Sequence, residues 1–214
     1  MQKTLKVTGK GKVEATPDII ILLFDVVSYE WEYEDAIKNL NKKVEKLREI
    51  AASFNIDRKK LITIDFQVNR LSSWDSDLKE HIFNGFRASH PIELELPLDN
   101  QFINNIIIRI INEIEGLEFR IRFGVKNPEK HEQLLIENAI HQAKKNAEII
   151  AKSAGIKLGD IVDINYSFSE VYFRSDEMDY QLNESCSMAE APMPDVNPDD
   201  IKLTETITIV WEIS

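Results

Sequence analysis

The sequence is poor in cysteine, in long apolar runs and in basic residues, and each shortage excludes a class of protein. Its one cysteine, Cys186, excludes an internal disulfide framework and a thiolate-rich zinc or iron–sulfur site. The longest apolar run, Ile19 to Phe24, is too short to cross a bilayer, so no membrane insertion is expected. Lys and Arg number 26 against 37 Asp and Glu, a formal net charge of −11. This balance argues against nucleic acid as a partner, because phosphate contacts need a basic surface.

The N-terminus lacks the features of a targeting signal. Met1 to Thr4 run directly into an alternating strand pattern, with no apolar h-region and no small-residue cleavage site. We therefore expect a cytoplasmic location if Met1 is the natural start, and a periplasmic one if a signal peptide has been removed. Hydrophobic residues at 43% and charged residues at 29% are near the globular average, which excludes disordered and fibrous chains.

Motifs for catalysis, cofactor binding and metal binding are also missing. Gly9-Lys10-Gly11 lies inside an alternating strand pattern rather than between a strand and a helix, so it does not predict a phosphate-binding loop. No G-x-S-x-G is present. The histidines have neither i, i+4 nor H-x-H spacing, although spacing leaves open a site assembled in three dimensions. They are His81, His90, His131 and His141. The sequence thus predicts no enzyme, cofactor or metal.

Alternation of apolar and polar residues predicts several strands. From Leu5 to Ala15 the odd positions are apolar or glycine and the even positions are polar, the period-2 pattern of a half-buried strand. The nearly continuous apolar run from Ile19 to Val27 predicts a central strand buried on both faces. The polar stretch 72–80 is predicted to be a loop. Further strands are expected at 62–68, 92–96, 117–123, 161–171 and 201–213.

Helical spacing of apolar residues predicts two helices within the first 124 residues. The second begins after Asp99, a good N-cap, and ends before Gly116. The first covers 30–55, with an apolar seam formed by Ile37, Leu40, Val44, Leu47, Ala51 and Phe54. The order of elements over about 18–124 is ferredoxin-like, βαββαβ. We therefore predict an α+β fold, with mainly antiparallel sheets and three long helices packed on one side.

A third helix is predicted from Asn127 as N-cap and Pro128 at the first helical position to Gly155 just past its end. Its inner face carries an alanine at every fourth position: Ala139, Ala143, Ala147 and Ala151. Small residues at this spacing let the helix come close to its partner. We expect that partner to be the strand face that carries Gly9 and Gly11.

The segment 170–200 differs from the rest of the chain. It contains nine acidic residues and one basic residue, so its net charge of −8 leaves only −3 for the remainder. It lacks any regular period, and we expect an acidic excursion that orders on meeting a partner. Its sulfur-containing residues suit either an interaction surface or oxidation by peroxide. These residues are Met178, Cys186, Met188 and Met193.

Three features together resemble the SIMPL domain family (DUF541). The opening V-x-G-x-G-x-V-x-x-x-P-D pattern is formed by Val7, Gly9, Gly11, Val13, Pro17 and Asp18. The second is the alanine-spaced helix that ends in A-x-x-A-G-I-x-L-G, with Ala151 and Gly155 among its residues. The third is the Met-, Ala- and Pro-containing segment before a final alternating strand. The resemblance covers essentially the whole chain.

The resemblance implies a single α+β domain over 1–214 without established enzymatic activity. It also implies self-association into rings or hollow assemblies, a protein partner and a role in stress response, since the family includes proteins linked to oxidative-stress defence. The strand patterns suggest two subdomains, 18–124 and 1–17 with 125–214. The sequence departs from the family in lacking a signal peptide and in carrying Pro198-Asp199-Asp200 where a P-G turn is usual.

Two hypotheses about function follow. The first is a non-enzymatic, self-assembling interaction or scaffold protein, whose 170–200 segment contacts partners or neighbouring subunits. The alternative is a small-molecule-binding or hydrolytic protein with a site between the sheet and that segment.

Overall fold

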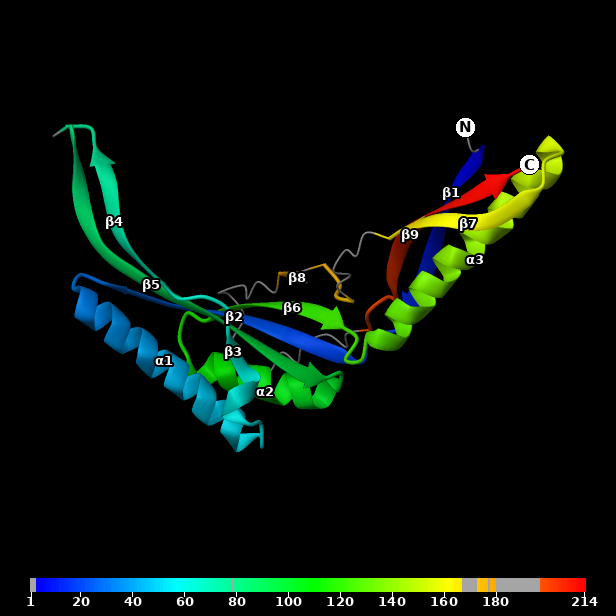
Figure 1. Cartoon of the computed structure of the whole chain (residues 1–214). Helices are drawn as coiled ribbons and strands as arrows, with labels where there is room; N and C mark the ends of the chain where they lie inside the picture. Colours follow the sequence, from blue (N-terminus) through cyan, green and yellow to red (C-terminus); the bar gives the residue numbers. More distant parts are fainter. Residues whose placement is uncertain (1–2, 78, 167–172, 177, 180–196) are drawn as a thin grey trace. The chain divides into compact units, whose positions relative to one another are not determined.

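The computed structural model describes residues 3–77, 79–166, 173–176, 178–179 and 197–214 (Figure 1). The chain divides into two compact units, each built from separate stretches of the sequence. Unit 1 comprises residues 1–17, 124–175 and 198–214, and unit 2 comprises residues 18–123 and 176–197. The fold is α+β with antiparallel pairing in both sheets, as the sequence predicts.

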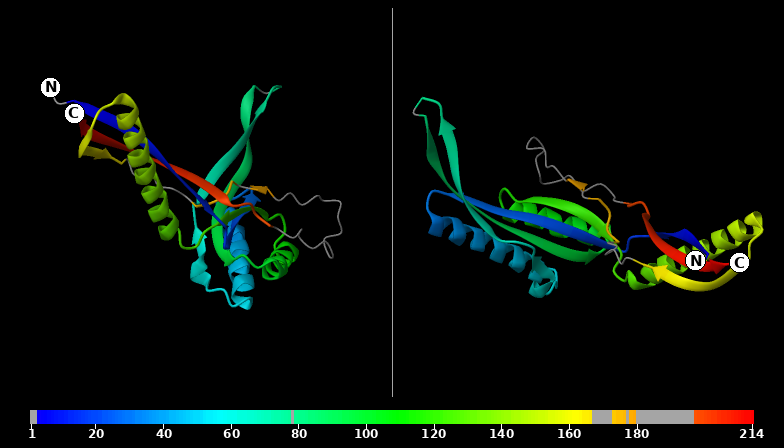
Figure 2. Two further views of the ribbon diagram at one scale, coloured as in Figure 1. Left: turned by 90° about the vertical axis from the view of Figure 1, so that its right-hand side faces the viewer. Right: turned by 45° about the horizontal axis from the view of Figure 1, so that its top comes forward.

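Unit 1 is a three-stranded sheet with one long helix on one face. The strands lie in the order β1 (Thr4–Ala15), β9 (Ile201–Ile213) and β7 (Leu158–Asn165). The two ends of the chain pair over the full length of β1, from Thr4 opposite Glu212 to Ala15 opposite Ile201. Helix α3 (Glu129–Ala154) lies along β1 and β9, as two further views show (Figure 2). The core between them contains Val7, Ala139, Ala143, Ala147, Ile207, Ile209 and Trp211.

Unit 2 has the ferredoxin-like arrangement that the order of its elements predicts. Its main strands lie in the order β4 (Gln67–Asp75), β5 (Glu80–Pro97), β2 (Ile19–Glu30) and β6 (Glu118–Gly124). The short strands β3 (Leu61–Thr63) and β8 (Met178–Asp179) add to β5 and β6. Helices α1 (Tyr33–Ser53) and α2 (Asn100–Glu113) bury their apolar faces in one continuous core with these strands, and a short 3-10 helix, η1 (Arg58–Lys60), precedes β3.

Local sequence features explain where the helices begin and end, and one predicted helix start needs correction. The Asp99 side chain accepts a hydrogen bond from Phe102 N–H at 3.1 Å and caps α2, as predicted. Gly155 ends α3 with a φ of 68°, in the left-handed region that favours glycine. Helix α3 begins at Glu129 with Pro128 as the N-cap, one residue later than predicted, although Pro128 already has helical dihedral angles. The seam of α1 includes Ala36 and Ile50, whereas Ile37 is only half-buried.

The prediction for residues 62–80 is wrong. The expected strand 62–68 is broken, since β3 ends at Thr63, and its buried residue is Leu61 while Ile62 and Ile64 are exposed. Residues 72–75 of the predicted loop belong to β4, and only the stretch between Asp75 and Glu80 is a turn, at residues 76, 77 and 79; β5 begins at Glu80 rather than near 92. These strands pair with each other where none of the described helices covers them. Without a buried face, their sequence has no hydrophobic alternation to indicate a strand.

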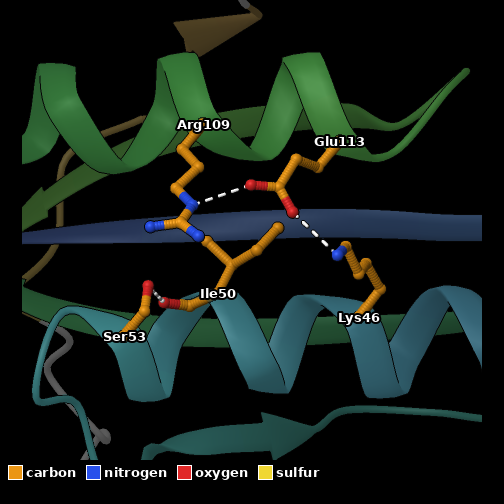
Figure 3. A network of polar contacts seen from close by, with 5 residues as sticks. All are labelled: Lys46, Ile50, Ser53, Arg109 and Glu113. Atoms are coloured by element: carbon orange, nitrogen blue, oxygen red, sulfur yellow. Dashed lines mark hydrogen bonds and ion pairs between the residues drawn. The ribbon is translucent and has the colours of Figure 1, made fainter.

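Charged side chains connect α1 to α2 at the surface of unit 2 (Figure 3). The Lys46 ammonium lies 2.8 Å from one Glu113 oxygen, and Arg109 Nε donates to the other at 2.7 Å. The hydrogen bonds from Lys46 and Arg109 lower the pKa of Glu113, and the bond to Glu113 raises the pKa of Lys46. The contact therefore keeps both groups charged and ties the two helices together.

Candidate functional site

Strand β1 and helix α3 lie in close contact in unit 1, at the two glycines that were predicted to face the alanine row. A Cβ atom at Gly9 would overlap the Ala139 carbonyl oxygen and lie 2.8 Å from the Ala143 Cβ. A Cβ at Gly11 would lie 2.9 Å from Ala139 N. The four alanines at positions 139, 143, 147 and 151 are buried. The structure therefore places the alanine row directly on the glycine face of β1, and only glycine permits this approach.

Polar side chains of α3 also hydrogen-bond to the backbone of β1. Gln142 Oε1 accepts from Lys10 N–H at 2.5 Å, and Asn138 Nδ2 donates to the Lys12 carbonyl oxygen at 3.1 Å. Strand β1 lies at the edge of its sheet, where backbone groups facing outward could pair with another strand. These two side chains occupy part of that edge, so β1 is poorly suited to strand addition.

At the opposite edge of the sheet, strand β7 carries apolar side chains that α3 does not cover. Ile161 pairs with Trp211 and Ile164 pairs with Ile209, so these isoleucines share the sheet face on which Ile209 and Trp211 form the core. Their exposed fractions are nevertheless 43% and 51%. Leu158 lies on the same strand and packs against the core. We refer to Leu158, Ile161 and Ile164 as the β7 row.

The β7 row is an exposed continuation of the core of unit 1. Helix α3 packs on β1 and β9 and makes few contacts with β7, so no helix in the described part of the chain covers the row. Two register shifts in β7, on either side of Ile161, interrupt its ladder with β9. Bulges of this kind discourage another strand from pairing at a sheet edge. The surface is therefore suited to side-chain packing against a partner rather than to extension of the sheet.

Glu205 is a buried charged residue that the sequence analysis missed. It occupies an inward position of β9, opposite Gly11, and its exposed fraction is 7%. One carboxylate oxygen accepts a hydrogen bond from Thr206 N–H at 2.9 Å. Burial raises the pKa of Tyr166, and the negative charges of Glu205 and Glu132 raise it further. A charged residue at an inward position of an alternating pattern is the signal that could have identified it.

The remaining predicted residues do not come together in one place. Pro17 is buried and Asp18 is exposed, with its backbone oxygen accepting from Leu98 N–H. Three of the sulfur-containing residues lie outside the described residues, and only the backbone of the fourth, Met178, is described, in β8. The three that lie outside are Cys186, Met188 and Met193.

The histidines lie apart from one another, each against a different neighbour. His131 contacts Phe173, His81 contacts Trp74, and His90 Nε2 shares a 2.8 Å hydrogen bond with Thr63 Oγ1. Burial, and to a smaller extent the charge of Arg48, lowers the pKa of His90. Across the described ranges, no three His, Cys, Asp or Glu side chains are grouped so as to hold a metal ion.

Two surface depressions, of about 580 and 460 Å³, lie along α1 in unit 2. The larger is lined by residues of α1 alone, from Tyr33 to Glu45, and the smaller also involves the end of β2. Neither lining includes a histidine or a cysteine, and the smaller one contains Ser28 together with Lys42 and Lys43.

No helix in the described part of the chain combines the length and the apolar character needed to cross a membrane.

Comparison with known proteins places the chain in a family and gives no activity. The family described as "SIMPL: Protein of unknown function (DUF541)" matches residues 5–211. The chain is 22% identical over 210 residues to "Uncharacterized protein YggE" of Edwardsiella ictaluri (strain 93-146), which covers 97% of this chain and 85% of that protein. It is 24% identical over 165 residues to the protein of the same description from Escherichia coli (strain K12), covering 76% of this chain and 65% of that protein.

Proposed function

Since the chain belongs to the SIMPL family (DUF541), whose function is unknown, we propose that it is a non-enzymatic assembly protein whose copies associate through the β7 row. The observation that carries this proposal is the exposed continuation of the unit 1 core on β7. Two isoleucines that face the same side as the buried Trp211 and Ile209 are left about half exposed. Contiguous apolar surface of this kind marks sites of protein association.

The energetics favour a covered β7 row. Full burial of an isoleucine side chain is worth about 1.5–3 kcal/mol. Covering the exposed half of Ile161 and Ile164 would therefore contribute about 2 kcal/mol per surface by the same scale. Because the edges of the sheet are protected against strand pairing, we expect this contribution to come from side-chain packing.

A small-molecule-binding or hydrolytic role has less support. Its expected location, between a sheet and the 170–200 segment, falls largely outside the described residues. The depressions along α1 contain neither histidine nor cysteine, and Ser28 in the smaller one is buried, with an exposed fraction of 4%. The role of the acidic segment in binding a protein partner or in the response to oxidative stress is a prediction of the sequence alone.

The molar mass of an Ile164→Lys variant in solution tests the proposal. A lysine in the β7 row would place a charge in the contact, and we expect the assembly to dissociate toward the 24.7 kDa chain in size-exclusion chromatography with light scattering. Leu134→Lys is the matched control, because Leu134 is a 48% exposed aliphatic residue of the same unit, on α3 and outside the row. An Ile164→Lys variant with the mass of the wild type and of this control would refute the proposal.

A further inference from the structure

A second exposed apolar surface lies on unit 2, along a ribbon formed by β4 and the first part of β5. We call residues 67–75 and 80–87 the arm. From Ser72–Phe83 to Asp75–Glu80 the arm consists of two paired strands, and only its base also pairs with β2, where Arg87 lies opposite Tyr29. Both figures of the whole chain show the ribbon extending past α1 without a helix over it (Figures 1 and 2).

One face of the arm carries a row of aromatic rings. Trp74 pairs with His81, two residues from the pair that contains Phe83, so the side chains of the two pairs share a face of the ribbon. Trp74 and His81 have ring centroids 5.2 Å apart, and Trp31 contacts Phe83 at 6.0 Å. Phe83 also contacts Phe86, which continues the row to Tyr33 at the start of α1. We call Trp31, Tyr33, Trp74, His81, Phe83 and Phe86 the aromatic row.

The aromatic row is exposed to an extent that is unusual for such large side chains. The exposed fractions are 67% for Trp31, 56% for Trp74 and 50% for Tyr33. The guanidinium of Arg70 lies 4.9 Å from the centre of the Phe83 ring. Tryptophan, tyrosine and arginine are the residues that contribute most to protein interfaces. A ribbon of only two strands is also marginally stable in water, which favours a role in which it packs against something else.

Resting on the proposed function, we infer that the aromatic row of one copy packs on the β7 row of a second copy. The two surfaces differ in chemistry, since one is aromatic and lies on a ribbon and the other is aliphatic and lies at the edge of a sheet. A contact between them covers both surfaces at once. A contact of the β7 row with itself would leave the aromatic row exposed.

Charge at the ends of the two surfaces favours the same pairing. The tip of the arm carries Asp75, Asp77 and Glu80 against one basic residue, Lys79. Near the β7 row, the charges of Lys152 in the last turn of α3 and of the exposed Lys157 are offset by the exposed Asp160 and Asp163 of β7. Two arms packed on each other would bring acidic tips together, whereas an arm on β7 brings an acidic tip to a surface whose lysines and aspartates balance.

Such a contact is heterologous, because the two copies that meet at an interface contribute different surfaces to it. A chain that has lost only its aromatic row still has a β7 row, and a chain that has lost only its β7 row still has an arm. Mixing two such variants should therefore restore one contact, and only one, per pair of chains.

A mixing experiment tests this inference. The arm variant is W31A/W74A and the row variant is I161K/I164K, with Trp74→Ala alone as a milder arm variant and circular dichroism as the check that each is folded. Each variant alone should have a mass of 24.7 kDa by light scattering, and their equimolar mixture should give a 1:1 complex of twice that mass. Tyr29→Ala is the control, since Tyr29 is 62% exposed but lies on the opposite sheet face from Phe86, and it should assemble as the wild type does.

Three other outcomes would overturn the inference, and they separate it from the proposed function. If the arm variant assembles as the wild type does while the row variant does not, the β7 row binds a different surface and only the inference fails. If both variants are monomeric but the mixture stays at 24.7 kDa, the arm does not bind the β7 row and the inference again fails. If the row variant assembles as the wild type does, the proposed function fails as well.

Discussion

Replacing Gly9 by alanine tests how closely α3 lies on β1. The added methyl group would overlap the carbonyl oxygen of Ala139 and lie 2.8 Å from the Cβ of Ala143. The nearest atom belongs to the helix backbone, so no change of side-chain rotamer relieves the overlap. The helix must move away from the strand, which also lengthens the hydrogen bond between Lys10 N–H and Gln142.

The expected loss of stability follows from these contacts. Overpacking of a tight core costs about 1–3 kcal/mol, and a weakened hydrogen bond costs about 1 kcal/mol. The unfolded chain is less flexible with alanine than with glycine, which offsets about 0.4–1 kcal/mol. We expect Gly9→Ala to lower the free energy of unfolding of unit 1 by about 2 kcal/mol, about a 30-fold change in the unfolding equilibrium.

Urea unfolding followed by tryptophan fluorescence measures this loss. The chain has three tryptophans, and only Trp211 is in the core of unit 1, at 3% exposure. In a W31F/W74F background its emission reports unit 1 alone. Lys10→Ala is the control, because the Lys10 side chain is exposed and its backbone N–H is retained. Equal stability of Gly9→Ala and Lys10→Ala would refute the close contact. Full rescue of Gly9→Ala by a second substitution, Ala143→Gly, would refute it as well, because that substitution leaves the overlapping Ala139 oxygen in place.

Two further predictions concern pH. The pKa of Glu113 is lowered by Lys46 and Arg109, so the stability it contributes is present above its ordinary pKa of 4.5 and is lost as pH falls through the lower folded-state value. Glu113→Gln should be less stable than the wild type at neutral pH, with a gap that closes below pH 4.5 and at high salt in urea titrations; a gap that persists in acid would contradict this. Burial and Arg48 lower the pKa of His90 below 6.5, so the neutral imidazole favours the folded state and stability falls as pH drops through that value. Thermal unfolding of His90→Asn should show a flatter pH dependence than the wild type between about pH 7.5 and 5.5, and an unchanged slope would exclude His90 as its source.

The sequence predicted those parts of the fold that have one buried face. The odd-position pattern of β1 and β9, the apolar run of β2 and the alanine spacing of α3 all report burial, and the structure contains each of these elements. The outer part of the arm was missed because it has no core to face, whereas Val68 and Phe86 at the base pack against the core of unit 2. Trp74 falls inside the stretch predicted to be a loop and His81 follows it directly, so their pairing across the ribbon had no signal in the sequence.

The sequence did not predict the β7 row, for a different reason. Ile161 and Ile164 are three residues apart, and a strict period of two assigns them to opposite faces of a strand. The register shift after Ile161 brings both to the face of the core. The register with β9 shows that Ile161 and Ile164 share a sheet face, and the position of α3 shows that this helix does not cover them.

The molar mass of the wild-type chain in solution tests the central claim most directly. Light scattering at micromolar concentration should give a multiple of 24.7 kDa that falls to 24.7 kDa in Ile164→Lys and is retained in Leu134→Lys. A wild-type chain that remains at 24.7 kDa over the whole concentration range would contradict the account, because the exposed β7 row would then have no second copy to cover it.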